Sequence, residues 1–133
     1  MKKSILFILF LFCSFAIAQN DKNVLKSVTF SQKIIKKRGL QLVLKSVTND
    51  SRCPEGVNCI WAGECEIEVA VYKNRKLIST ENILLSPKMQ KENIDWFQKY
   101  YPRFKIKEIG VLPYPKNEVV VDPKDKYVKI YFE

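Results

Sequence analysis

Three cysteines lie near the middle of the chain, and their thiols are the most reactive groups in that region. Cys53, Cys59 and Cys65 are evenly spaced, with five residues between neighbours. Three thiolates could bind copper(I), with Met89 as an additional ligand. Zinc prefers four ligands at tighter spacing, and the sequence contains no histidine. One of the two functions that we consider for this chain is therefore a metal-binding or redox-responsive protein that uses these three cysteines as its site.

A disulfide is the other use of these cysteines. Two close cysteines on either side of a loop with proline and glycine are typical of a disulfide in an exported protein. A bond between Cys53 and Cys59 would stabilise the fold by about 2–3 kcal/mol. Cys65 is in phase with the apolar residues that follow it, so we predict a free buried thiol there. Pairings of Cys65 with Cys53 or Cys59 remain alternatives.

Other catalytic groups are scarce. Without histidine there is no histidine-based triad, general base or metal ligand. Glu64, Glu66 and Glu68 alternate along one predicted strand, which spaces their carboxylates roughly 7 Å apart, within the range that glycosidases use. We expect them on a flat, solvated sheet face, paired with lysines of a neighbouring strand. The sequence therefore predicts a protein that is not an enzyme and has no cofactor.

Candidate binding residues occur in the cysteine loop. Asp50 and Arg52 flank the turn into the loop, and we expect them to bond to each other or to backbone groups and so fix its shape. Binding a ligand through this ion pair is the alternative. For Trp61 we expect packing on the disulfide inside the core, as in many β-sandwiches, with an exposed stacking platform as the alternative.

Two further aromatic segments are candidates. Trp96 lies in a cluster with Phe97, Tyr100 and Tyr101, for which we predict half-buried packing, or a partner surface if the rings are exposed. Tyr114 lies between two prolines, and we predict that this segment is a rigid crossover between sheets, because proline cannot continue a central ladder.

The elements that must position these residues are mostly strands. Alternation of apolar and polar residues predicts strands at 40–45, 64–71 and 127–132, with further candidates at 24–30, 76–84, 103–111 and 118–121. Asn74 and Arg75 predict a tight hairpin turn. About seven short strands favour an all-β fold, a single β-sandwich, with a small β-barrel as the alternative.

One segment departs from this pattern. Between residues 86 and 101, Met89, Ile94, Phe97 and Tyr101 fall on one helical face, and Ser86 and Pro87 suit a helix start. We predict a short helix or an ordered loop there, packed over one end of the sandwich.

The first residues predict export. Lys2 and Lys3 precede an apolar run, and a small-x-small sequence ends at Ala18, the order of a cleaved signal peptide. Phe12 before Cys13 argues against a lipoprotein. We expect residues 1–18 to be removed after Ala18, leaving residues 19–133 as one domain in the periplasm or outside the cell, with no later segment apolar enough to span a membrane.

The chain is basic. Its formal charge falls from +9 to +7 when Lys2 and Lys3 are removed. Export and the lack of arginine-aromatic interleaving argue against nucleic acid, which leaves an anionic surface polymer, anionic lipid or an acidic envelope protein as partner. The favoured interpretation of the charge is solubility, with lysines at solvent-facing strand positions. The one dense basic run, from Lys33 to Arg38, precedes Gly39 and is typical of a solvated hairpin tip. We expect a monomer.

The cysteine loop also resembles a known family. The run Asp50-Ser51-Arg52-Cys53-Pro54, followed by Cys59-x-Trp61-Ala62-Gly63, resembles the signature of a widespread set of uncharacterised small exported bacterial proteins and lipoproteins. Their later Pro-Tyr-Pro element and final strand are matched by Tyr114 with its flanking prolines and by Tyr127. The chain departs from this family pattern in two ways. It has Cys65 in addition to the usual two cysteines, and it lacks a lipobox.

The resemblance implies a compact β domain with a disulfide between Cys53 and Cys59, and it implies no activity. Together with the residues themselves, it favours a non-enzymatic binding or structural module of the cell envelope. We expect such a module to use the residues around Trp61 or the aromatic residues near Trp96.

Overall fold

A computed structural model describes residues 26–33 and 38–133. It is mostly β, as predicted, with six strands rather than about seven, arranged in two open antiparallel sheets and not a closed barrel. The strands are β1 (Ser27–Ser31), β2 (Leu40–Asp50), β3 (Cys65–Lys73), β4 (Lys76–Leu85), β5 (Ile106–Leu112) and β6 (Tyr127–Phe132).

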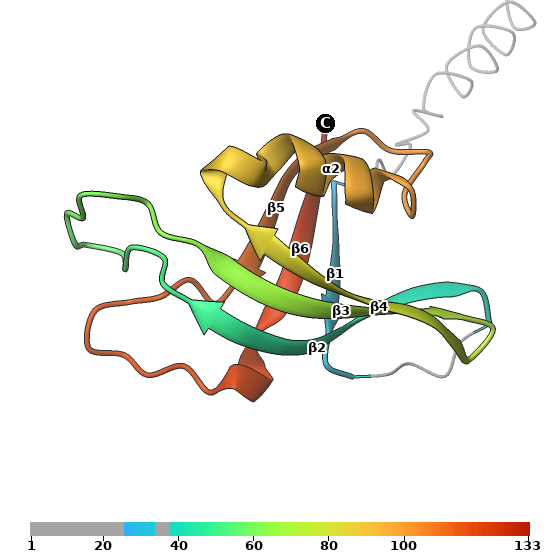
Figure 1. The fold of residues 1–133 in the computed structure, drawn as a ribbon, viewed down its shortest axis with the longest axis horizontal. Helices are drawn as coiled ribbons and strands as arrows, with labels where there is room; N and C mark the ends of the chain where they lie inside the picture. Colours follow the sequence, from blue (N-terminus) through green and yellow to red (C-terminus); the bar gives the residue numbers. More distant parts are fainter. Residues whose placement is uncertain (1–25, 34–37) are drawn as a thin grey trace, which may run out of the picture.

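The two sheets each hold three strands. One has the order β1-β6-β5 and the other the order β2-β3-β4, so the second is a simple meander while the first joins both ends of the described chain. Strands of the two sheets run across one another, and helix α2 (Gln90–Gln98) lies over one end of the pair (Figure 1). The helix connection carries the chain from β4 of one sheet to β5 of the other.

Alternation along the strands builds one core between the sheets. Cys65, Ile67 and Val69 on β3 are fully buried, and they meet Val128 and Ile130 of β6 in a single cluster. The free thiol of Cys65 therefore behaves as a small apolar core group, as predicted from its phase.

The predicted hairpin at Asn74 and Arg75 is confirmed. Lys73 of β3 pairs with Lys76 of β4 around these two residues, whose φ angles are 50° and 69°. Positive φ at both central positions is the geometry that matches the right-handed twist of paired strands. The side chain of Asn74 also accepts a hydrogen bond from the backbone N–H of Gly39 at 2.9 Å.

The predicted helix is also confirmed. A 3₁₀ turn, η2 (Pro87–Met89), leads into α2, and Phe97 on its inner face is completely buried against Phe30 and Trp96. Met89 does not follow the predicted face, because it lies in the 3₁₀ turn and is 38% exposed.

A single glutamine joins the end of the helix to the sheet that follows. The amide nitrogen of Gln98 donates to the carbonyl oxygens of Tyr101 and Phe104, both at 2.7 Å, and its amide oxygen accepts from the N–H of Ile106 at 3.2 Å. These bonds fix the direction in which the chain enters β5, which positions the edge of that strand beside the helix.

Two predictions for the segment after β5 are wrong. Residues 118–121 do not form a strand, because Glu118 has a φ of 62° in a turn that Val119 closes with Lys116. Tyr114 and its flanking prolines are not a crossover between sheets, since they join β5 to β6, which pair in one sheet.

Some predictions lie outside the described residues. They include the signal peptide at residues 1–18 and, in the basic run, Lys36 and Lys37. Within the residues that the structure does describe, no helix has the length and apolar character needed to cross a bilayer.

Candidate functional site

The cysteine loop, residues 51–64, continues the hairpin of β2 and β3. The N–H of Ser51 donates to the carbonyl oxygen of Glu64 at 2.8 Å, and the N–H of Cys53 donates to that of Ala62 at 3.0 Å. The Ser51 hydroxyl lies 3.2 Å from the Glu64 carbonyl oxygen and 3.3 Å from its N–H. The base of the loop is therefore held like a strand pair, with only the part between Cys53 and Ala62 free of this ladder.

Gly63 makes this close approach possible. Its φ is 72°, and a β-carbon built there would lie 2.6 Å from the carbonyl carbon of Ser51 and 2.8 Å from the Cα of Arg52. Both the backbone conformation and the contact with the opposite strand require a residue with no side chain. Within the Trp61-Ala62-Gly63 sequence, Gly63 thus allows the backbones on the two sides of the loop to approach each other closely.

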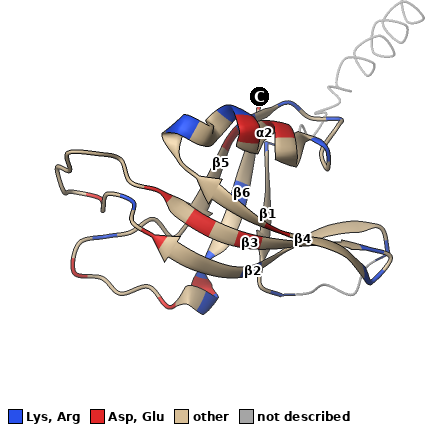
Figure 2. Ribbon diagram, viewed as in Figure 1, with Lys and Arg blue, Asp and Glu red and all other residues tan. Residues whose placement is uncertain are grey.

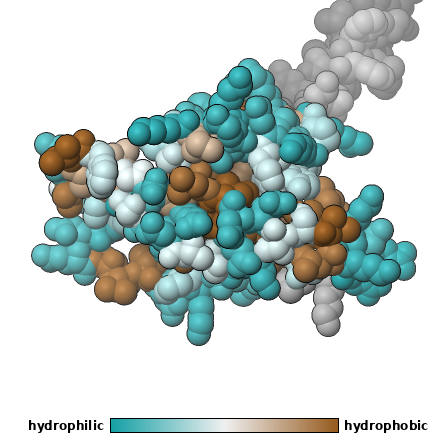
Figure 3. Space-filling model, viewed as in Figure 1, coloured by the Kyte–Doolittle hydropathy of each residue, from teal (hydrophilic) through white to brown (hydrophobic). Residues whose placement is uncertain are grey.

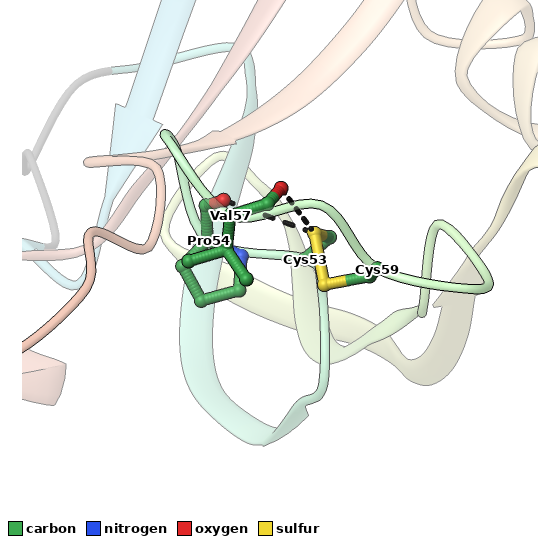
Figure 4. The surroundings of a disulfide bond; sticks show 4 residues. All are labelled: Cys53, Pro54, Val57 and Cys59. Atoms are coloured by element: carbon green, nitrogen blue, oxygen red, sulfur yellow. Dashed lines mark hydrogen bonds between the residues drawn. A yellow bond between two sulfur atoms is a disulfide. The ribbon is translucent and has the colours of Figure 1, made fainter.

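A disulfide closes the remainder of the loop. Cys53 is bonded to Cys59, and the Cys53 sulfur lies 3.2 Å from the carbonyl oxygen of Val57 inside the ring (Figure 4). Cys65 is outside this ring, buried and unbonded. In the part of the chain that the structure describes, no group of three or more cysteine, aspartate or glutamate side chains is placed to hold a metal ion.

Asp50 and Arg52 form the predicted ion pair, and a third residue joins them. The guanidinium of Arg52 donates to both carboxylate oxygens of Asp50, at 2.7 and 2.8 Å. Lys126, which precedes β6, donates to the same carboxylate at 2.7 Å. All three side chains are between 9% and 13% exposed. One carboxylate thus links the end of β2, the cysteine loop and the start of β6.

Arg52 also connects this cluster to the other sheet. Its remaining terminal nitrogen, Nη1, donates to the carbonyl oxygen of Val111 on β5 at 2.7 Å. Its guanidinium carbon lies 4.6 Å from the ring centre of Tyr114, a cation–π contact. Each nitrogen of the guanidinium is therefore bonded within the protein. This supports the expectation that Asp50 and Arg52 fix the loop's shape.

Burial and the charges of this cluster shift the pKa values of the groups in and around it. Burial alone would raise the pKa of Asp50, but hydrogen bonds and charges of Arg52 and Lys126 outweigh it and lower the pKa from 3.8 to about 2. Cys65 lies nearby, and its burial together with the Asp50 charge raises the thiol pKa to about 11. The thiol is therefore protonated at neutral pH and is a poor nucleophile and metal ligand.

Trp61 lies at the exposed end of the loop. Its side chain is 80% exposed, so the prediction that it packs on the disulfide inside the core is wrong. Ile60 is fully exposed beside it, and Val57, inside the disulfide ring, is 40% exposed. We call these three residues the apolar tip. Because Gly63 and Cys59 hold the backbone on both sides of Trp61, the ring is directed away from the core.

A second loop, residues 113–126, lies beside the cysteine loop. The N–H of Glu55 donates to the carbonyl oxygen of Pro115 at 2.8 Å, and the side chains of Glu55 and Lys116 are 3.9 Å apart. This second loop exposes Val119 and Val120, which are 57% and 96% accessible. Figure 3 shows apolar side chains at the end of the molecule where both loops project.

Trp96, the other candidate tryptophan, lies elsewhere. It is half-buried on α2, with its ring centre 4.8 Å from those of Phe97 and Tyr100. Tyr101 is half-buried as well and contacts Phe132. Half-buried packing is confirmed for Trp96, Tyr100 and Tyr101, whereas Phe97 is completely buried. The structure does not bring Trp96 together with Trp61.

The three glutamates of the β3 region are half-buried rather than solvated. Figure 2 shows acidic positions along β3. Glu68 accepts a hydrogen bond from the Ser46 hydroxyl of β2 at 3.2 Å. Among the described residues, the ion pairs include none of Glu64, Glu66 and Glu68, so the predicted pairing with neighbouring lysines is wrong.

Sequence reasoning missed two parts of the site. Lys126 is 76 residues away from its partner Asp50, and nothing in the local pattern distinguishes it from the other lysines. The carbonyl oxygen of Val111 is a backbone group, so no side chain marks it. Gly63 is the one residue of the site whose type indicates its structural role in advance, because glycine close to a cysteine loop often indicates a close backbone approach.

Known proteins offer no further guide to this site. No family model, no curated protein and no solved structure matches the chain significantly.

Replacing Gly63 by alanine tests the close approach at the base of the loop. Gly56 is the matched control, because it lies in the same loop with a similar φ of 79° but has nothing within 4 Å of a built β-carbon. Alanine at position 56 should cost about 1–2 kcal/mol from backbone strain alone. Alanine at position 63 should cost more than about 3 kcal/mol, because the clash adds to the strain. Urea unfolding of both variants measures this, and equal losses would contradict it.

Replacing Asp50 by asparagine tests the buried carboxylate. The pKa of Asp50 is lowered on folding, so its contribution to stability is present above pH 3.8 and is lost as the pH falls towards about 2. At pH 7 the variant should lose at least about 2 kcal/mol of unfolding free energy. Urea unfolding between pH 7 and pH 2 should show this difference shrinking below pH 4. The control is Glu81→Gln on the exposed edge of β4; a pH-independent difference for Asp50→Asn would refute the assignment.

Proposed function

We propose that the chain is an exported, non-enzymatic binding module of the cell envelope, which contacts its partner through the apolar tip. The observation that carries this proposal is the exposure of Ile60 and Trp61 on a loop whose backbone is held in place. Large apolar side chains gathered at one exposed point mark interaction surfaces, and tryptophan is enriched among the residues that contribute most to binding.

The rigidity of the loop supports this role. The Cys53–Cys59 disulfide, the ladder at Ser51 and the close approach at Gly63 order the loop before any partner binds. A pre-ordered loop avoids the entropy cost of being fixed on binding, so more of the contact energy appears as affinity. The same bonds keep the apolar tip from folding back onto the core.

The chemistry of the neighbouring groups supports a binding role over catalysis. Asp50, Arg52 and Lys126 are bonded to one another, and the raised pKa of Cys65 keeps its thiol protonated. The disulfide and the burial of Cys65 also count against the alternative, a metal-binding or redox-responsive protein, since that function needs three accessible thiolates.

The likeness to the uncharacterised exported bacterial proteins fits this proposal. Of the residues in the shared loop motif, Asp50, Arg52, the two bonded cysteines and Gly63 all have bonding or steric roles in the loop. Trp61 is 80% exposed and has no such role among the described residues, which supports contact with a partner as its role.

A thiol count separates the binding module from the metal-binding alternative. The chain from Gln19 to Glu133 should add no alkyl group to cysteine when folded, one when unfolded without reductant, and three when unfolded and reduced, because only Cys65 is free and it is buried. Intact-mass spectrometry after alkylation measures this. Three labelled thiols without reductant, or a mass increase matching a metal ion in the native spectrum, would favour the alternative.

Replacing Ile60 and Trp61 together by serine tests the apolar tip. Mixed with the isolated envelope fraction of the source cells and sedimented, the double variant should pellet at least about tenfold less than the unaltered protein, since two exposed apolar anchors are lost. Because neither side chain packs on the core, the unfolding free energy should stay within about 0.5 kcal/mol.

The matched control replaces Leu77 and Ile78 by serine. These residues are 56% and 60% exposed on β4, at the end of the sheet away from the cysteine loop. The control should pellet like the unaltered protein. If both double variants pellet equally less, nonspecific hydrophobic association causes the sedimentation. If both pellet like the unaltered protein, the apolar tip does not bind the envelope fraction.

A further inference from the structure

A cleft separate from the apolar tip lies where α2, β5 and the base of the cysteine loop meet. Its volume is about 390 Å³. Small binding sites in proteins fall in this size range and are mostly apolar with a few placed polar groups. The walls of this cleft follow that description, and they include Leu85, Ile94, Ile109, Leu112, Asn93 and Glu108.

One wall of the cleft is the free edge of a strand. β5 is last in the order β1-β6-β5, so one of its edges has no neighbouring strand within residues 26–33 and 38–133. The carbonyl oxygen of Val111 points to this edge, because it accepts the hydrogen bond from Arg52. Backbone groups of an antiparallel strand point to alternate edges, so the N–H and C=O of Ile109, two residues earlier, face the same way. Although Ile109 lies opposite Ile130 of β6, its N–H and C=O thus point away from β6, and no loop or turn bond among the described residues reaches them.

Gly110 leaves this edge unobstructed. It lies between Ile109 and Val111, and a β-carbon built on it would have no atom within 4 Å. Its φ is not in the left-handed region, so backbone conformation does not require glycine there. Glycine inside a strand often marks a place where another backbone approaches closely.

A buried side chain on the helix also directs an unused polar atom into the cleft. Asn93 is 7% exposed, and its amide nitrogen donates to the carbonyl oxygen of Leu84 at 2.9 Å. Its amide oxygen has no partner among the described residues. No fully buried side-chain nitrogen or oxygen in the described chain lacks a partner, so this oxygen is accessible, and Asn93 is one of the residues that line the cleft. Asn93 thus supplies an acceptor without a partner at the wall of the cleft.

We propose that the cleft binds a short extended peptide segment of a partner protein, which adds as a strand to β5. The free N–H and C=O of Ile109 would pair with the peptide backbone, and an apolar side chain of the peptide would lie between Ile94 and Leu85. Strand addition of this kind takes its affinity from backbone hydrogen bonds and its specificity from side-chain pockets. Arg52 already occupies the carbonyl oxygen of Val111, so the added strand ends there and is short.

Charge narrows the class of peptide. Asp50 pairs with both Arg52 and Lys126, and each nitrogen of the Arg52 guanidinium is already bonded. Glu108 is exposed, and it is the one charged residue lining the cleft that has no ion-pair partner among the described residues. A lysine or arginine beside the apolar anchor complements this carboxylate. The site is therefore selective for apolar-basic segments, in spite of the basic charge of the chain as a whole.

The edge of β4 is the other sheet edge that could accept a strand, and it is interrupted at one point. β4 also ends its sheet, but the register shift where Tyr72 pairs with Leu77 and Val71 with Ser79 leaves Ile78 as an extra residue in the edge. Such bulges interrupt the row of backbone groups and protect an edge from pairing. β5 has a register shift of its own between Ile106 and Glu108, and its pairing is regular from Glu108 to Leu112, the part that lies beside the cleft.

The test uses a fluorescent, end-blocked pentapeptide with the sequence lysine-valine-leucine-valine-lysine and the full chain from Gln19. Fluorescence anisotropy should show saturable binding, and nitrogen-edited NMR should place the shifted amides at Ile109, Gly110 and Asn93. The same peptide with methylated backbone nitrogens keeps its side chains but loses its donors, so it should bind at least about tenfold more weakly.

Variants of the chain complete the test. Gly110→Val suits a strand and should preserve folding while filling the approach to the edge, and Glu108→Lys should reverse the charge at the rim; each should weaken binding at least about fivefold. Glu81→Lys is the control on the other sheet edge and should bind the peptide normally. Serine in place of Ile60 and Trp61 should also leave binding intact, which keeps this result separate from the role of the apolar tip.

Several outcomes would overturn the proposal. Equal binding of the methylated peptide would show that the cleft recognises side chains alone. Shifted amides along β4 or at Trp61 would place the peptide elsewhere. Absence of saturable binding up to millimolar peptide, with cooperative unfolding confirming the folded state, would show that this edge does not accept an extended peptide of the proposed class.

Discussion

The carboxylate of Asp50 is the point on which the arrangement of this molecule depends. It receives Arg52 and Lys126 in a nearly buried position, and these residues come from the cysteine loop and from the start of β6. Because Arg52 reaches on to Val111 of β5, one anion connects both sheets and the loop. A buried charge network of this kind adds little stability over apolar packing, but loss of one member leaves unpaired charges and is costly. Its effect is therefore to fix geometry.

Both proposed binding surfaces follow from that geometry. On one side of Arg52, the cysteine loop is held away from the core with Ile60 and Trp61 exposed. On the other side, the same guanidinium occupies the end of the β5 edge and sets the limit of the cleft. Arg52 shapes both surfaces, and each nitrogen of its guanidinium is already bonded within the protein. We therefore infer that Arg52 has a structural role and that neighbouring residues contact the partners.

Local pattern predicted much of this fold and less of the site. Alternation at Cys65, Ile67 and Val69 located β3 and the buried thiol, and the spacing around Phe97 located the helix, because both signals depend on residues close in the sequence. The bond from Lys126 to Asp50 spans 76 residues and left no periodic trace. The packing of tryptophan on a disulfide in many β-sandwiches predicts a buried Trp61, but Gly63 and the disulfide fix the backbone so that the ring points outward.

Exposed apolar groups at the tip require such fixing. If the loop were flexible, Ile60 and Trp61 would fold against the sheet edges. Full burial of a large apolar side chain stabilises a protein by about 1.5–3 kcal/mol. The disulfide alone does not prevent this, because it closes the ring without setting its direction. Direction comes from the bonds at Ser51 and from Arg52, which join the base of the loop to the strands. The loop can thus keep its apolar side chains in water because its base is part of the fold, and the conformation that a partner would meet is the one already present in the free protein.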